Sequence, residues 1–118
     1  MKVELIHYWN SEDEVDRPFF PKEKDNFCIN FQFLVGEKGK EGTEYFQVLI
    51  CTPKWILKNE KDKKIISSRH RLIVFEYDQK SIVNYIKHYL SNINEDTWDA
   101  VVKKIERIAK SEYEDYIP

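Results

Sequence analysis

The chain is organised around residues 46–57, which read Phe46-Gln47-Val48-Leu49-Ile50-Cys51-Thr52-Pro53-Lys54-Trp55-Ile56-Leu57. The first half alternates in the way that is typical of a β-strand with at least one buried face. The alternation stops at Thr52 and Pro53. A threonine hydroxyl can cap a helix, and proline suits the first helical position, so a helix is predicted to begin here. The stretch therefore predicts a strand, a corner and a short helix, whose Trp55, Ile56 and Leu57 fold back over the sheet.

A second alternating segment, residues 26–35, precedes this strand. The residues between the two strands include every glycine of the chain, namely Gly36, Gly39 and Gly42. Glycines between two strand-like segments indicate a β-hairpin, with Gly39-Lys40 as the predicted two-residue tip. Such a tip places Phe33 opposite Phe46, so that one face of the hairpin carries an unbroken apolar stripe.

The same register places Cys28 opposite Cys51, and two interpretations follow. One is a disulfide across the hairpin, and the other is a pair of reduced, packed thiols. The chain has 2 cysteines and no N-terminal apolar leader segment, which favours a reducing, cytoplasmic location. We therefore expect reduced thiols. No apolar run approaches the roughly 20 residues needed to cross a bilayer, so we expect no membrane partner.

Two further strands and two loops are predicted outside the hairpin. Residues 2–9 alternate as an opening strand, and residues 71–76 form the fourth strand. The predicted opening strand has one face made of Val3, Leu5, His7 and Trp9. Acids and prolines break the pattern over residues 11–24, and charged residues dominate residues 58–64. We expect both of these segments to be loops.

Helical spacing of apolar side chains occurs twice near the C-terminus. Asp78 is the predicted N-cap of an amphipathic helix over residues 79–91. Asn94 or Asp96 is the predicted N-cap of a last helix, which reaches Ala109. The resulting order is β-β-β-α-β-α-α, which belongs to the α+β class. We expect an antiparallel sheet of about four strands with the C-terminal helices packed on one face, in a single domain over residues 1–118.

Composition and charge narrow the classes of function. The net charge is −2, which does not favour a nucleic-acid or membrane partner. Residues 54–71 nevertheless hold 7 basic and 2 acidic side chains, between two acidic segments. This basic segment is either a solvated loop and edge strand or a surface that follows a phosphate backbone.

Catalytic and metal-binding patterns are weak in this sequence. His7, His70 and His88 are far apart and lack the short spacing of zinc ligands. A nucleophilic pair of Cys51 with a histidine would depend on spatial proximity alone, and a small buried hydrophobe is the more common role of a strand cysteine. The glycines do not fit a phosphate-binding loop. We expect no catalytic residue, no metal and no cofactor.

Two acidic clusters stand out beside aromatic residues. The first contains Glu12, Asp13, Glu14 and Asp16, and the second contains Glu112, Glu114, Asp115 and Tyr116. Both can be solvated surface. Alternatively, they dock to a basic protein, because charge steers the encounter and aromatic side chains supply anchoring area.

Residues 45–57 resemble the signature of the immunity protein 8 family of bacterial polymorphic toxin systems. That signature is a strand ending in Cys-Thr-Pro, then a variable residue, Trp and a leucine-like residue, where this chain has Ile56. Other segments agree in order, namely Arg69-His70-Arg71-Leu72-Ile73-Val74, Asp78, Trp98 and Glu114-Asp115-Tyr116. Residues 11–24 match no part of the pattern.

The resemblance implies a small cytoplasmic inhibitor, not an enzyme, that binds a cognate toxin domain as a monomer or weak homodimer. It implies a structural role for the motif residues Cys51, Thr52, Pro53 and Trp55. The two acidic clusters are then the expected partner-binding residues, because toxins that attack nucleic acid carry basic clefts. The alternative function is a generic binding module for nucleic acid or protein that uses Lys58–Arg71.

Overall fold

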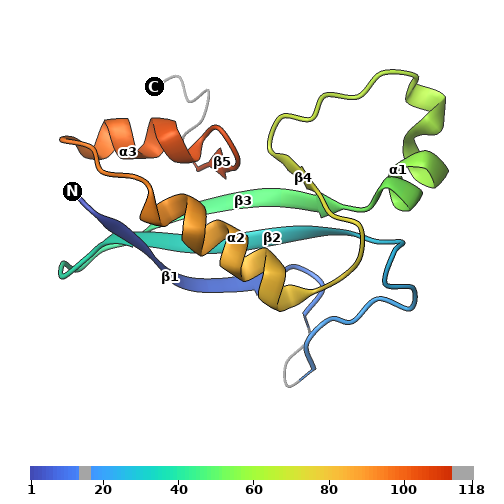
Figure 1. The fold of residues 1–118 in the computed structure, drawn as a ribbon, viewed down its shortest axis with the longest axis horizontal. Coiled ribbons are helices and arrows are strands. Elements are labelled where there is room, and N and C mark those ends of the chain that lie inside the picture. The colour runs from blue at the N-terminus through green and yellow to red at the C-terminus, as the bar shows by residue number, and fades with distance from the viewer. Residues whose placement is uncertain (14–16, 113–118) are drawn as a thin grey trace.

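The computed structural model describes residues 1–13 and 17–112 of the chain (Figure 1). Its sheet contains the strands β1 (Val3–Asn10), β2 (Cys28–Glu37), β3 (Glu44–Cys51), β4 (Arg71–Ile73) and β5 (Lys110–Ser111). Its helices are α1 (Pro53–Glu60), α2 (Gln79–Ser91) and α3 (Trp98–Ile105), and a short 3-10 helix, η1 (Lys61–Lys63), follows α1. The predicted α+β class and the predicted order of the longer elements are confirmed.

The sheet order is β1-β2-β3-β4, and β5 pairs with β3 beside β4. β1, β2 and β3 are antiparallel, as predicted, but β4 runs parallel to β3. The reason is the connection: α1 and the loop after it form a crossover, which returns the chain in the same direction as β3. β5 was not predicted, because a two-residue strand is too short to show an alternating pattern.

The predicted hairpin register is confirmed, with Phe33 opposite Phe46 and Cys28 opposite Cys51. The predicted two-residue tip is wrong. β2 and β3 are joined by residues 38–43. A Cβ atom on Gly36 would lie 2.9 Å from the carbonyl oxygen of Gly42, so the two ends of this wider turn pass close together only because Gly36 has no side chain.

The structure joins Cys28 and Cys51 in a disulfide bond, which corrects the expectation of two reduced thiols. The physical reason is the register, which holds the two residues directly opposite each other with their Cα atoms 4.1 Å apart. Since the sulfur of Cys51 is bonded, this structure offers no thiolate for the nucleophilic pair considered above.

A β-bulge between Leu5 and His7 interrupts β1. Ile6 has no partner opposite it on β2, so the alternation shifts by one residue after Leu5. Leu5 and Tyr8 pack against the core, whereas His7 stacks on Trp9 on the other face with the ring centroids 5.6 Å apart. The prediction that His7 and Trp9 share a face with Leu5 is therefore wrong.

The core lies between one face of the sheet and the C-terminal helices, as predicted. Figure 1 shows α2 running across β2 and β3, with α3 beside β5. The sheet side of this core is formed by Ile29, Phe31, Phe33, Val35, Phe46, Val48 and Ile50, and the helix side by Ile82, Val83, Ile86, Leu90, Val101 and Ile105. Burial of this apolar surface is the main force that holds the helices on the sheet.

Two of the three predicted helix starts are confirmed, at Thr52 and Asp78. The third is wrong, because Thr97 caps α3 in place of Asn94 or Asp96. The Thr97 hydroxyl accepts a hydrogen bond from the N–H of Ala100 at 3.2 Å, whereas the Asn94 side chain accepts one from the N-terminal amine at 3.2 Å. α3 ends at Ile105, short of the predicted end, because the chain turns there toward β5.

α1 differs from the prediction in length and position. It continues to Glu60, so residues 58–60, expected to be a loop, are helical. Figure 1 places α1 beyond the end of β3, away from α2 and α3. Leu57 is 66% exposed, and the prediction that this helix folds back over the sheet is therefore wrong.

Candidate partner-binding site

Three of the predicted partner-binding residues lie within the part of the chain that the structure describes. Glu12 and Asp13 are exposed just after β1, and Glu112 is exposed just after β5. The other predicted residues lie outside the described residues, and they are Glu14, Asp16, Glu114, Asp115 and Tyr116.

The structure does not bring Glu112 beside Glu12 and Asp13. β1 pairs with β2, while β5 pairs with the far edge of β3, so that two strands lie between them. Figure 1 shows the loop after β1 and the end of β5 on different sides of the sheet. The described acidic residues therefore belong to two separate surfaces.

The carboxylate of Asp13 has a structural role in the loop after β1. Its Oδ2 accepts a hydrogen bond from the N–H of Asn10 at 3.0 Å, and its Oδ1 accepts one from the N–H of Phe19 at 2.7 Å. These bonds connect the end of β1 to the segment that contains Phe19. Glu12 is exposed beside it, so a charge reversal at Glu12 leaves this loop contact intact.

Glu112 lies among other carboxylates. Burial raises the pKa of Glu44, a hydrogen bond from Trp98 opposes this, and the negative charges of neighbouring carboxylates raise the pKa further. Those carboxylates belong to Glu106, Glu112 and Asp99. The Trp98 Nε1–Glu44 Oε1 distance is 3.3 Å. The surroundings of Glu112 are thus rich in negative charge, which suits contact with a basic surface.

Several cationic side chains of the basic segment form ion pairs within the fold. Arg71 donates two hydrogen bonds to the carboxylate of Glu60, and Lys63 Nζ lies 3.2 Å from the same group. The Glu60 side chain is only 5% exposed, and the hydrogen bond from Arg71 is the main cause that lowers its pKa. Lys54 pairs with Glu23 and Asp25. These pairs weaken the alternative interpretation that the basic segment follows a phosphate backbone.

The corner at Thr52 is buried and saturated with hydrogen bonds. The Thr52 hydroxyl oxygen accepts from the N–H of Phe27 at 3.1 Å and from that of Trp55 at 3.4 Å. Its O–H also lies 3.4 Å from the carbonyl oxygen of Phe27. Thr52 therefore joins the start of β2 to the start of α1, and this corner holds the fold together.

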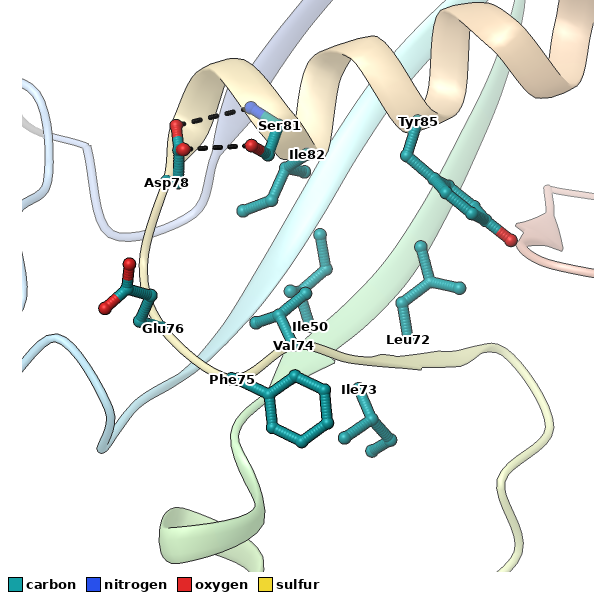
Figure 2. A pocket seen from close by; sticks show the side chains of 10 residues that line it. All are labelled: Ile50, Leu72, Ile73, Val74, Phe75, Glu76, Asp78, Ser81, Ile82 and Tyr85. Carbon is teal, nitrogen blue, oxygen red and sulfur yellow. Dashed lines mark hydrogen bonds between the residues drawn. The ribbon is translucent and has the colours of Figure 1, made fainter.

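One hollow of the surface lies between β4 and α2. We call it the β4–α2 groove, and it is lined by Ile50, Leu72, Ile73, Val74, Phe75, Glu76, Asp78, Ser81, Ile82 and Tyr85. Its volume is about 450 Å³. Figure 2 shows Ile82 and Tyr85 reaching from α2 toward Ile50 and Leu72, while Asp78 is held by two hydrogen bonds to Ser81.

The β4–α2 groove was not predicted from the sequence, although the sequence contains one signal of it. In residues 71–76, both sets of alternating side chains are apolar, with Leu72 and Val74 in one set and Ile73 and Phe75 in the other. A strand with two apolar faces should be central, yet this strand lies at the sheet edge. Which set stays exposed depends on which of the two faces α2 in the folded chain.

A second missed surface lies on the opposite face of the sheet, which carries aromatic and amide side chains. Trp9 lies against Tyr45 with the ring centroids 6.0 Å apart. The Tyr45 hydroxyl donates to Gln32 Oε1 at 2.5 Å, and the Asn30 amide donates to Gln47 Oε1 at 2.9 Å. Because these groups bond to one another, they order this face without requiring a ligand.

Across residues 1–13 and 17–112, no three His, Cys, Asp or Glu side chains form a group that could hold a metal ion. None of the helices in these residues is both long enough and apolar enough to cross a membrane.

Comparison with known proteins assigns the chain to a family. A profile of the family described as immunity protein 8 matches residues 4–116. The match includes the Thr52 corner, the β4–α2 groove and both acidic clusters. Searches among curated proteins and among solved structures find no match. Because the matched span covers nearly the whole sequence, the chain belongs to the immunity protein 8 family.

Proposed function

We propose that this protein binds and neutralises the toxin domain of a bacterial polymorphic toxin system, in the cytoplasm of the cell that makes the toxin. The observation that carries the proposal is the family match over residues 4–116. Neutralisation in this proposal is a protein–protein contact made by a single domain, and it requires no catalytic step, metal or cofactor.

Electrostatics supports acidic surfaces as part of the contact. A toxin domain that acts on nucleic acid must present a basic surface to phosphates. The exposed Glu12, with its neighbours Glu14 and Asp16, and the carboxylates around Glu112 complement such a surface in charge. Long-range attraction of this kind accelerates association more than it slows dissociation.

Co-expression with the toxin domain encoded beside this gene tests the proposal. We expect the two proteins to co-purify as a complex and the toxin-producing cells to survive only when the immunity protein is present. If no complex forms and the cells are not protected, the proposed function is wrong.

Charge reversal then tests the acidic surfaces separately. Reversing Glu12, Glu14 and Asp16 to lysine should slow association with that toxin domain by about tenfold at low salt, with a smaller effect at high salt. Reversal of Glu112, Glu114 and Asp115 provides a matched comparison on the other surface. If both sets leave the association rate unchanged, acidic steering does not contribute.

A further inference from the structure

The β4–α2 groove exposes more apolar surface than its place in the fold requires. Phe75 is 81% exposed, and Ile73 and Tyr85 are about half exposed beside it. β4 is at the edge of the sheet, where exposed apolar side chains favour association with another chain. Exposed apolar patches of this kind mark interaction sites when their rim is polar.

The groove has a shape that accepts an apolar side chain. Ile50, Leu72 and Val74 form its sheet side, and Ile82 and Tyr85 form its helix side. In Figure 2, Ile73 and Phe75 lie on the side of their segment that is turned away from α2. A bound segment would thus contact aliphatic side chains within the groove and the Phe75 ring at its rim.

The polar rim of the groove is acidic at one end. Glu76 and Asp78 lie there, and Asp78 is occupied as the N-cap of α2 through Ser81. The hydrogen bonds from Ser81 are the main cause that lowers the pKa of Asp78, and the nearby Lys80 lowers this pKa further. Glu76 is exposed and makes no ion pair within residues 1–13 and 17–112, so its charge is available to a cation on a partner.

The groove borders a second hollow, whose residues connect it to Asp13 of the first acidic cluster. This second hollow, lined in part by Phe19, Phe20 and Tyr77, shares Glu76 with the β4–α2 groove. The Tyr77 hydroxyl donates to the carbonyl oxygen of Phe19 at 3.3 Å, and the N–H of Phe19 donates to Asp13. Apolar anchoring area and acidic charge therefore meet on one side of the molecule, whereas Glu112 lies elsewhere.

From these contacts we infer that the β4–α2 groove binds an apolar segment of the toxin domain that carries a lysine or arginine next to its apolar side chain. This inference rests on the proposed function. The apolar side chain enters between β4 and α2, the rest of the bound segment packs on the Phe75 ring at the rim, and the neighbouring cation pairs with Glu76. Aromatic anchors surrounded by complementary charge are the usual centre of tight protein interfaces.

The test measures binding of the toxin domain encoded beside this gene to the whole immunity protein and to single variants. We expect Phe75→Ala to raise the Kd about 30-fold or more, as is typical of a central anchor. We expect Glu76→Lys to slow association about tenfold at low salt, with a smaller effect at high salt. Both side chains are exposed, and circular dichroism and thermal melting verify that each variant is folded.

Ile65→Ala is the matched control, because Ile65 is 87% exposed and apolar but does not line the groove. Its Kd should stay within about twofold of the wild-type value, as for a surface residue outside the contact. If the wild-type protein binds the toxin domain and Phe75→Ala and Glu76→Lys bind equally well, the groove inference is wrong and toxin neutralisation stands. If the wild-type protein itself does not bind, the proposed function fails.

Sedimentation of the immunity protein alone examines the other possible occupant, a second copy of this chain. Under the inference, the wild-type protein and Phe75→Ala have the same mass in solution. A wild-type dimer that Phe75→Ala dissociates would show that a second copy covers the groove, and it would overturn the inference.

Discussion

Phe46 and Phe75 are identical side chains in contrasting positions. Phe46 lies in β3 under the helices and is 0% exposed, whereas Phe75 follows β4 and is 81% exposed. The difference arises because Phe46 belongs to the core that faces the helices, whereas Phe75 lies on the side of its segment that is turned away from α2. The side that faces the helices specifies the fold, and the side turned away leaves apolar area for another molecule.

The largest expected effect is on the covered side. Phe46→Ala should lower the free energy of unfolding by about 3–5 kcal/mol, because it removes buried apolar area and leaves a cavity between sheet and helices. Denaturant unfolding followed by tryptophan fluorescence measures this change. A loss below about 1 kcal/mol would show that the core rearranges to fill the space and would remove the contrast with Phe75.

A smaller loss is expected at the Thr52 corner. Thr52→Val keeps the shape but removes the acceptor for the N–H groups of Phe27 and Trp55, and should cost about 2 kcal/mol. Thr52→Ser is the matched control, because it keeps the hydroxyl, and it should retain most of the stability. No loss in Thr52→Val would show that these hydrogen bonds do not stabilise the corner.

The Glu60–Arg71 pair should contribute a pH-dependent stability. The pKa of Glu60 lies below its usual value of 4.5, chiefly through the hydrogen bond from Arg71. At a pH above that usual pKa, the charged Glu60 side chain therefore stabilises the folded state. This contribution is lost as the pH falls through the lowered pKa of Glu60 in the folded protein. We expect wild type to be more stable than Glu60→Gln at neutral pH, with the difference vanishing in acid.

Glu76→Gln is the comparison variant for that measurement, because Glu76 is an exposed carboxylate on the rim of the groove. Denaturant unfolding at a series of pH values should show no pH-dependent difference in stability between wild type and Glu76→Gln. If Glu60→Gln and Glu76→Gln differ from wild type in stability by the same amount, general surface charge sets the pH dependence, and not the pair of Glu60 with Arg71.

The smallest effect on stability is expected at Phe75. Phe75→Ala should change the free energy of unfolding by less than about 0.5 kcal/mol, as is usual for an exposed side chain, even though the same variant is expected to lose toxin binding. Thermal and denaturant unfolding of the free protein measure it. A loss comparable with that of Phe46→Ala would place Phe75 among the residues that hold the fold.

Local sequence patterns predicted the parts of the fold that depend on neighbours in the chain. The alternation around Phe33 and Phe46 and the glycines between them were sufficient for the hairpin register. Thr52 and Asp78 were recognisable as caps because a cap bonds to backbone only a few residues away. The same rule failed at Asn94, whose side chain binds the distant N-terminus.

Features that depend on distant segments were not predictable in this way. The bulge at Ile6 moved His7 and Trp9 to the open face, because nothing in a strand pattern indicates where one residue is left unpaired. The pairing of Glu60 with Arg71 joins α1 to β4 across an intervening loop. The acidic clusters were visible as composition, but the separation of Glu112 from Glu12 and Asp13 depended on the strand order.

By itself, the sequence determined the family, through its match to a family profile. It also determined the α+β class, the hairpin register and the corner at Thr52, because these follow from the period of apolar side chains and from contacts between near neighbours in the chain. Only the tertiary structure decided that β4 is a parallel edge strand and that Phe75 stays exposed beside an open groove. Exposure depends on which distant segments meet, and Phe75 lies on the side of its segment that is turned away from α2.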